Sequence, residues 1–444
     1  MEYLFNLTLT QMGFWIIWLM IPLLVEIIPG IYSTCYLFIK KFRMKKMEYS
    51  EKLPFISVII PVYNSADTLY ECIRSIDAST YPNENIQVIL ADNGSSDDSF
   101  AVFNEAHNHF NQLNMHWIRT EQGKAQALNS AIYSSIGTYI INIDSDGYLE
   151  PTALMNMVLK FENDYSISAM TGTVLTQKEV IRKTKSPLIR WLQKSEFVEY
   201  AQSFLAGRNV EAMNNRLFTM AGAFSGFRKE VLINTYLYNI DTVGEDTDMT
   251  FQIRHRLKGK VSLCENAIFY VEPIQSFDEL YIQRQRWQRG EMEVAKEFSE
   301  EQVGLGNFFK NFLVRRLIID HTFIFPKMIW LFASVVLFYF GYTAKILMLS
   351  YLLIYLLYLF DSLLKFISIL LLLRSFRTDQ KFYLKLWAEV MTFPFYNFMV
   401  SWFRLIGIIN GITSPSKWNT TPISKEISKI KETISNDLIK IRKK

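Results

Sequence analysis

One apolar run near the start of the chain limits the possible folds of this sequence more than any other feature. Between Gly13 and Ile39 the only charged residue is Glu26, and about 20 apolar residues suffice for a helix to cross a bilayer. No positive charge precedes the run, and the ones that follow it directly are Lys40, Lys41, Arg43, Lys45 and Lys46. By the positive-inside rule, residues 1–53 are expected to form an uncleaved signal anchor and a basic linker, with the N-terminus outside.

Further apolar stretches lie in the last quarter of the chain. Residues 321–342 and 346–373 are each long enough to cross a bilayer, whereas 390–412 is a weaker candidate because it contains Pro394 and Arg404. We therefore expect about three spans over residues 321–412. Within the second stretch, Asp361 and Lys365 are four residues apart, so on a helix they are expected to pair.

The segments around these spans are basic. Residues 302–320 predict an amphipathic helix in the membrane interface, with an ordinary surface helix as the alternative. Residues 413–444 form a basic tail. Three spans after a cytoplasmic domain would place this tail outside, although its charge favours the inside. Either one stretch lies only in the interface, or the long run 346–373 is broken.

Residues 54–301 predict a soluble α/β domain. Three short apolar runs at 56–61, 86–91 and 139–144 are typical of strands buried on both faces of a parallel sheet. Residues 66–78 and 124–135 predict helices between these strands. Repeated alternation of strands and helices predicts an α/β fold with helices on both faces of the sheet.

The overall composition excludes several classes of protein. Lys and Arg number 47 against 43 Asp and Glu, and a net charge of +4 is too small to indicate binding of nucleic acid. The cysteines are Cys35, Cys72 and Cys264, an odd number at wide spacing. They indicate neither a disulfide framework nor a zinc site, and suggest a reduced, cytoplasmic setting for the soluble part.

Polar residues follow the predicted strands at the points where a ligand would bind an open α/β sheet. Asn64 follows the strand that contains Pro61, and Asp92 begins the segment Asp-Asn-Gly-Ser-Ser-Asp. A solvated turn is the plain alternative for the second segment. Gly123 and Lys124 begin a predicted helix, whose N-terminus suits a diphosphate, although Lys124 could equally be a surface lysine.

Two acidic clusters stand out further along the chain. Asp144 and Asp146 follow a buried strand on alternate residues, which favours a hard divalent cation, Mg²⁺ or Mn²⁺, over an acidic turn. About a hundred residues later, Glu245 and Asp246 offer a candidate general base. By themselves these two acids are better explained as helix caps.

The segment Gln283-Arg-Gln-Arg-Trp287 combines guanidinium groups, which suit phosphate, with an indole that offers a flat apolar face. A basic helix at the membrane surface is the plain alternative. In their order along the chain, all these segments resemble a family 2 glycosyltransferase of the membrane-integrated, processive kind. Hyaluronan, chitin-oligosaccharide, cellulose and poly-N-acetylglucosamine synthases share this pattern, which here extends over roughly residues 54–290. The length and the layout of apolar stretches also resemble a Gram-positive glycosyltransferase group associated with exosortase systems.

The resemblance implies a GT-A-type fold, with a mixed, mostly parallel sheet, and a role for each matched residue. It implies that Asp246 is the catalytic base, with Glu245 beside it. The residues implied to bind the nucleotide sugar are Pro61, Asn64, Asp92, Lys124, Asp144 and Arg286. Those implied to bind the acceptor are Gln283, Trp287, Gly222 and Ser225. Asp146 and Asp144 would hold Mg²⁺ or Mn²⁺, and Trp418-Asn-Thr-Thr421 resembles a W-x-x-T element that follows the membrane spans.

The implied reaction is inverting transfer from a UDP-sugar to a glycan, which would build a surface or extracellular polysaccharide at the plasma membrane from a cytoplasmic domain. Single addition to a lipid-linked acceptor is one alternative, and a non-catalytic membrane scaffold or transporter is another. Expected partners are the UDP-sugar, the glycan or lipid-linked acceptor, the lipid bilayer, and accessory export or exosortase-system proteins. Asn93 replaces an Asp of many relatives, which affects the expected nucleotide contacts, and the few predicted spans weigh against a self-made polymer channel.

Overall fold

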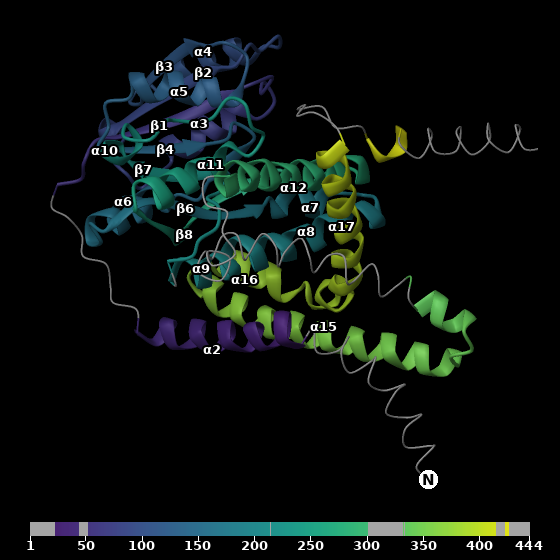
Figure 1. Cartoon of the computed structure of the whole chain (residues 1–444). Coiled ribbons are helices and arrows are strands. Elements are labelled where there is room, and N and C mark those ends of the chain that lie inside the picture. The colour runs from purple at the N-terminus through teal and green to yellow at the C-terminus, as the bar shows by residue number, and fades with distance from the viewer. Residues whose placement is uncertain are drawn as a thin grey trace, which may run out of the picture.

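The computed structural model describes residues 23–43, 52–213, 215–300, 332, 334–413 and 422–425. Residues between β1 and α12 form an α/β unit, and long helices from both ends of the chain lie together beside it (Figure 1). Several expectations concern residues outside this description. They are the first part of the N-terminal anchor, most of the basic linker that follows it, the interfacial helix at 302–320, the first part of the span at 321–342, the element Trp418–Thr421 and most of the basic tail.

Within the described residues, eight strands form one mixed sheet in the order β3-β2-β1-β4-β7-β6-β8-β5. In chain order the strands are β1 (Ile56–Val62), β2 (Ile86–Asp92), β3 (Asn114–Arg119), β4 (Tyr139–Ile143), β5 (Gly147–Leu149), β6 (Ile167–Thr176), β7 (Phe224–Arg228) and β8 (Lys260–Val271). The first four pair in parallel. β7 runs antiparallel between β4 and β6, β6 pairs in parallel with β8, and β5 is antiparallel to β8. The sheet is therefore mixed, and all three predicted strands are present as β1, β2 and β4.

Helices cover both faces of the sheet, as the strand composition predicts. Every residue of β1, β2 and β4 is buried, because apolar side chains on both sides of these strands meet helices. One face packs against α3 (Leu69–Asp77), α4 (Ser99–His109) and α6 (Ala153–Asn163). The other face packs against α5 (Lys124–Ser134), α10 (Lys229–Leu232) and α11 (Glu245–Phe251).

A long helical connection joins β6 to β7, and a long helix follows β8. The first contains α7 (Lys178–Lys183), α8 (Pro187–Tyr200), the π-helical turn η3 (Ala201–Gly207) and α9 (Arg208–Met213). The π-helical turn η4 (Gln252–Arg256) leads from α11 to β8, and α12 (Phe277–Glu300) follows β8.

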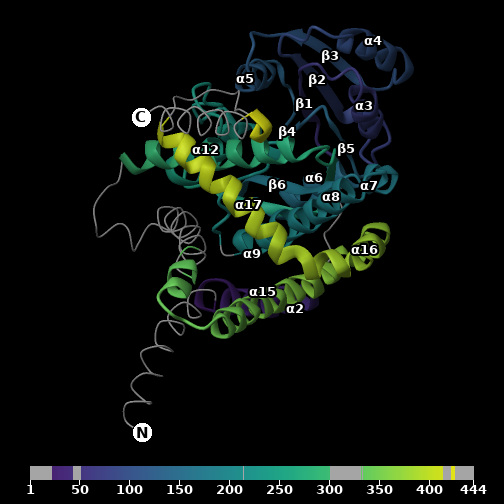
Figure 2. The same ribbon diagram turned by 90° about the vertical axis from the view of Figure 1, so that its right-hand side faces the viewer.

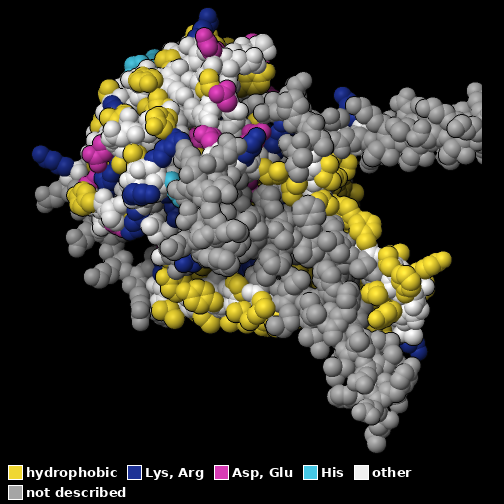
Figure 3. All heavy atoms as spheres, viewed as in Figure 1, with side chains coloured by type: hydrophobic (Ala, Val, Ile, Leu, Met, Phe, Trp, Pro, Cys, Tyr) yellow, Lys and Arg dark blue, Asp and Glu magenta, His cyan; other side chains and the backbone are white. Residues whose placement is uncertain are grey.

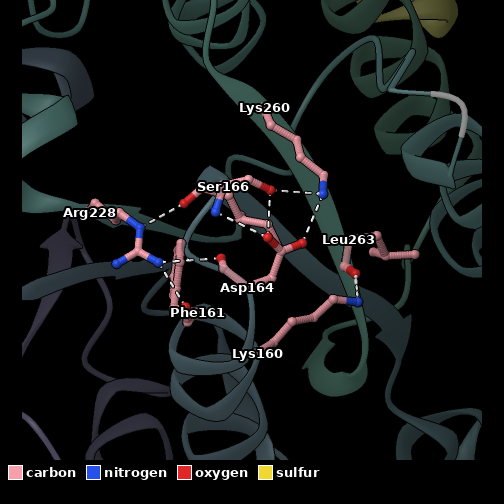
Figure 4. A network of polar contacts seen from close by, with 8 residues as sticks. Lys160, Phe161, Asp164, Ser166, Arg228, Lys260 and Leu263 are labelled. Carbon is pink, nitrogen blue, oxygen red and sulfur yellow. Dashed lines mark hydrogen bonds and ion pairs between the residues drawn. The ribbon is translucent and has the colours of Figure 1, made fainter. Parts of the chain in front are cut away.

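A polar network ties β6, β7 and β8 together at the edge where β4 begins (Figure 4). Arg228 donates to the carbonyl oxygens of Phe161 and Ile167 at 2.7 and 2.8 Å. Lys260 forms an ion pair of 2.8 Å with Asp164. Because β4 carries Asp144 at its other end, this network supports the sheet from the edge opposite that acid.

Two of the flanking helices run side by side in the same direction. The π-helical turn η1 (Leu23–Ile27) leads into α2 (Ile28–Arg43), which packs along α15 (Ala344–Leu372). Ser368 donates to the Thr34 hydroxyl at 3.1 Å, and Gly30 lies against Asp361. The predicted pairing of residues 361 and 365 is confirmed by an ion pair of 2.7 Å.

Among the described residues, one stretch, Ala344–Ser375, is long and apolar enough to cross a membrane. After it, the short turn η5 (Leu373–Ser375) and α16 (Arg377–Leu384) lead to α17 (Trp387–Thr413). The described part of the chain thus supports one of the three expected C-terminal spans.

The third expected span, residues 390–412, corresponds to α17, and this helix packs against α8 and α12 of the α/β unit and against α15 (Figure 2). Its buried side chains are Val390, Phe393, Tyr396, Val400 and Phe403. The Trp191 indole of α8 donates to Thr392 at 3.0 Å, and Lys194 pairs with Glu389 at 2.7 Å. Aromatic and polar contacts with α8 and α12 therefore cover one side of a helix whose apolar composition had predicted a membrane span.

Candidate active site

Three predicted site segments meet at one edge of the sheet because they follow parallel strands. Val62, the last residue of β1, pairs with Asp92, the last residue of β2. Asp144 follows β4, which is the other neighbour of β1. Pro61 is buried inside β1 opposite Ala91, so the structure gives it a place in the sheet and not at the surface.

The loops after β1 and β2 hold each other in place. Asn64 adopts a positive φ of 48°, and its side-chain oxygen accepts from the Ser96 N–H at 2.8 Å. The Asp92 carboxylate accepts from the Ser95 N–H at 2.9 Å and is only 9% exposed. The turn that was the plain alternative for residues 92–97 is therefore present, and it orients Asp92 at the site edge.

Asn93 binds the loop that precedes α5. Its side-chain oxygen accepts from the N–H of Gly123. Gly123 has a φ of 140°, a conformation that other residues rarely adopt, so a glycine is needed there. The contact fixes the start of α5, and Lys124 is the first residue of that helix.

Lys124 reaches across the site to Asp144, with 2.5 Å between Nζ and Oδ1. Burial alone would lower the pKa of Lys124, but the carboxylates of Asp144, Glu245 and Asp246 raise it to about 12. Lys124 is therefore a charged partner of both acidic clusters. Asp144 contacts this ammonium group directly, and Glu245 and Asp246, about a hundred residues later in the sequence, act on it through their charge.

Asp146 remains exposed to solvent on its side chain. The surrounding protein withdraws the Asp146 carboxylate from bulk water, and this effect, together with the like charge of Asp144, raises the pKa of Asp146 to about 6, while the positive charge of Lys124 opposes the shift. Within the described residues, no three His, Cys, Asp or Glu side chains form a complete metal cage. Two carboxylates fit Mg²⁺ or Mn²⁺ if substrate phosphates and water complete the shell, as is usual for Mg²⁺.

The second acidic cluster begins α11. The Asp246 carboxylate accepts from the N–H groups of Gly222 at 3.2 Å and of Thr247, the next residue of the helix, at 2.8 Å. Burial raises the pKa of Glu245 to about 7, with Asp246 adding to this effect and the positive charges of Lys124 and Arg286 opposing it. Arg286 therefore faces the same cluster from α12.

Two of the four residues implied to bind the acceptor differ in their access to the site. Gly222 lies beside Asp246, where an added Cβ would be 3.4 Å from the carboxylate. Ser225 is 2% exposed within β7, and its hydroxyl donates to the Ala221 carbonyl at 3.0 Å. The structure therefore gives Ser225 a contact inside the sheet.

Gln283 and Trp287 lie on the face of α12 that meets α8 and η3. Gln283 donates to the Tyr200 hydroxyl at 3.4 Å. The Trp287 ring has Tyr200 and Phe204 as aromatic neighbours, at centroid distances of 6.1 and 5.8 Å. The guanidinium of Arg284 lies 4.3 Å from the centre of the Trp287 ring.

Arg284 was missed as a functional residue in the sequence analysis. It is 2% exposed and pairs with Glu199 of α8, which also accepts from the Tyr396 hydroxyl of α17 at 2.7 Å. A spacing of three residues on a helix, Arg before Trp, is the signal that could have indicated this contact. Arg284 covers part of the indole, so it limits which face of Trp287 a ligand can reach.

Comparison with known proteins identifies the domain. Residues 57–235 match the family model described as Glycosyl transferase family 2. Residues 57–235 thus form a domain that is similar to the family 2 glycosyltransferases. Lys124, Asp144 and Asp146 lie within the matched residues, and Glu245 and Asp246 follow them.

Two curated relatives and one solved structure extend the comparison. Poly-beta-1,6-N-acetyl-D-glucosamine synthase of Staphylococcus epidermidis is 24% identical over 279 residues, which cover 62% of this chain and 64% of that protein. A Bacillus subtilis protein named probable glycosyltransferase YdaM is 25% identical over 329 residues, 73% of each chain. The solved mannosyltransferase PcManGT from Pyrobaculum calidifontis, in complex with GDP-Man and Mn²⁺, covers 87% of this chain and 96% of its own, with a TM-score of 0.58 and 15% identity. This likeness confirms the GT-A-like glycosyltransferase fold.

Proposed function

We propose that this protein is a membrane-bound, inverting glycosyltransferase that uses a UDP-sugar to extend a surface or extracellular polysaccharide. The observation that carries the proposal is the convergence of both acidic clusters on Lys124, which pairs with Asp144 at 2.5 Å. Positive and negative groups held at one sheet edge suit the transfer of a sugar from a charged diphosphate.

Asp246 is the proposed base. Its two backbone hydrogen bonds hold the carboxylate in place, while partial exposure leaves it accessible to an acceptor hydroxyl. In-line attack by that hydroxyl on the anomeric carbon would invert the centre in one displacement, with the acceptor proton passing to Asp246. This reaction needs no covalent intermediate.

The departing diphosphate would be bound by groups from three elements. Lys124 at the N-terminus of α5 and Arg286 of α12 supply positive charge on the protein itself. Asp144 and Asp146 would hold Mg²⁺ or Mn²⁺, which would neutralise charge on the diphosphate when bound. Asp92, at the end of β2, would contact the uracil.

The acceptor would bind on the side of Trp287. An indole stacks on the apolar face of a pyranose, and the aromatic neighbours of Trp287 fix the ring in place. Because Arg284 covers part of the ring, a sugar would use the remaining surface.

Lipid would surround α2 and α15. Apolar side chains gather along the lower part of the molecule in Figure 3, where these helices lie in Figure 1. The exposed apolar residues of the two helices include Ile28, Ile31, Ile39, Met348, Leu349, Leu352, Leu356, Phe360 and Ile367. A helix with an apolar exposed surface of this length suits a bilayer.

A donor screen tests the proposal. Purified protein in detergent should release UDP from one of a panel of UDP-sugars and fail with GDP-mannose, with Mg²⁺ or Mn²⁺ present. Asp146→Asn and EDTA should each abolish release, and added metal should restore the EDTA-treated wild type. Glu105→Gln, on the exposed face of α4, serves as a charge-matched control. Full activity in EDTA would exclude the metal role, and sizing the product separates polymer synthesis from single addition.

A further inference from the structure

We propose that Glu293 of α12 is a positioning residue for Asp246, because it holds the loop before α11 onto the helix that carries Arg286. The inference rests on the proposed function, in which Asp246 is the base. Glu293 belongs to none of the motifs that the sequence analysis identified.

A single carboxylate oxygen organises the loop. Glu293 Oε2 accepts from the Thr242 hydroxyl at 3.0 Å and from the Val243 N–H at 3.2 Å. The Thr242 hydroxyl in turn accepts from the Gly244 N–H at 3.1 Å. The other oxygen of Glu293 accepts from Arg289 at 3.1 Å, which orients the carboxylate toward the loop.

Two glycines bring the backbones close enough for these bonds. A Cβ on Gly290 would lie 2.9 Å from the Gly244 Cα, and a Cβ on Gly244 would lie 2.8 Å from the Gly290 carbonyl oxygen. Any larger residue at either position would separate α12 from the loop. Glu293 lies three residues after Gly290 and therefore on the same helix face.

The loop needs an anchor from outside. Gly244 precedes α11 and has no side chain with which to cap it. Glu245 and Asp246 are the next two residues, so movement of the loop moves both acids. Arg286 lies one turn before Gly290, and the anchor therefore sets the distance between Arg286 and the acidic cluster.

The test uses four variants of the full-length protein. Glu293→Ala removes every bond of the carboxylate, whereas Glu293→Gln keeps an oxygen that can accept from Val243. The control is Glu297→Ala, which removes an exposed acid one turn further along α12, with one contact of 3.5 Å to Asn239. A double variant adds Thr242→Val to Glu293→Ala.

A displaced catalytic group commonly lowers turnover by about 10- to 100-fold. We expect Glu293→Ala to lower kcat by about that factor, with the KM for the donor and UDP binding within about threefold of wild type. Glu293→Gln should recover most of the rate, and Glu297→Ala should match wild type. Thr242→Val should add little in the double variant, because both changes break the same contact.

Three outcomes would overturn the inference. They are an unchanged kcat in Glu293→Ala, parallel losses of kcat and UDP binding in both Glu293 variants, or equal rates in the Ala and Gln variants. The proposed function fails separately, if the wild type releases no nucleotide from any donor in the panel. In that case UDP binding and melting temperature still show whether Glu293 only stabilises the fold.

Discussion

Asp246 shows how a residue that resembles a helix cap can also be placed for chemistry. One of its oxygens accepts from the N–H of Thr247, the next residue of α11, and the other accepts from the N–H of Gly222 in a loop before β7. The second contact crosses between elements and orients the carboxylate at the site edge. A capping role alone does not require it.

We expect Asp246→Asn to lower turnover by about 10²–10⁴-fold, because an amide cannot accept the acceptor proton. UDP binding should remain near wild type, since the amide oxygen can still accept from the same N–H groups. Initial rates and calorimetric titration with UDP measure the two effects. A high residual rate together with weakened UDP binding would show that Asp246 is structural.

Glu196 is a second acid with an unusual environment, and it lies away from the acidic clusters. It is fully buried in α8, where one oxygen accepts from the Ile274 N–H at 3.0 Å and the other has no hydrogen-bond partner among the residues that the structure describes. Burial raises the pKa of Glu196 to about 8 from an ordinary value of 4.5, although Arg284 opposes the shift. The carboxyl is therefore protonated near neutral pH.

This pKa predicts how stability depends on pH. Between pH 4.5 and 8 the folded protein keeps a proton that the unfolded chain releases, so the free energy of unfolding falls as pH rises. Glu196→Gln removes the titration and retains an acceptor for Ile274. Its melting temperature should be close to wild type at pH 5 and higher than wild type at pH 8. A difference that does not vary with pH would contradict the prediction.

At the scale of elements, α12 lies between the α11 region and α17. One face carries Gly290 against Gly244, and Val294 and Phe298 pack in an apolar cluster with Phe251. The opposite side carries Gln285 and Gln288, which accept from Asn410 and Arg404 of α17 at 2.9 and 2.7 Å. The helix that contributes Arg286 is therefore held from both sides.

Gly290→Ala tests this arrangement. The added Cβ would lie 2.9 Å from the Gly244 Cα, and backbone cannot move aside as a flexible side chain can. We expect overpacking to lower the free energy of unfolding by about 1–3 kcal/mol. We also expect kcat to fall further than it does in the surface control Glu297→Ala. Thermal melting and initial rates provide the measurements. Wild-type values for both would show that α12 and the loop adapt freely.

At the scale of the whole molecule, contacts of α2 and α15 join these two long helices to the α/β unit. Lys40, near the end of α2, pairs with Glu265 of β8 at 2.6 Å. Asp379 of α16, the helix that follows α15 after the turn η5, pairs with Lys178 of α7 at 2.6 Å. Both helices therefore reach the α/β unit with their C-terminal ends.

These contacts favour one of the topologies that the sequence left open. If α15 crosses the membrane, its start at Ala344 would lie on the side away from the α/β unit, and one more crossing before Ala344 is then expected. Residues 321–342 are the predicted crossing. Because α17 packs on the α/β unit, the basic tail would return to the cytoplasm, in agreement with its charge.

Thiol labelling in intact cells tests this topology. Only Cys35 among the native cysteines is exposed, so Cys35→Ser provides the background. An impermeant reagent should label Asn6→Cys in intact cells, and should label Lys440→Cys only after permeabilisation. Tyr133→Cys, at a position 80% exposed on α5, should behave like Lys440→Cys. Labelling of Lys440→Cys in intact cells would contradict a cytoplasmic tail.

The class of fold could be predicted from the sequence alone. Strands buried on both faces appear in a sequence as continuous apolar runs, whereas in the helices between them apolar residues recur with the helical period. It also located the chemistry-bearing segments, since parallel strands must end at the same edge of a sheet. The pairing of residues 361 and 365 could likewise be predicted, because it depends only on helix geometry.

How those segments pack against one another could be seen only in the tertiary structure. The hydropathy of residues 387–413 shows that α17 is apolar. It does not show whether the helix is surrounded by aromatic side chains of α8 or by lipid. The stacking of Arg284 on Trp287, the burial of Ser225 and the contact between Gly244 and Gly290 depend on which distant elements pack together. Such long-range contacts are chosen by the shape of the whole core, and local sequence patterns carry little information about that shape.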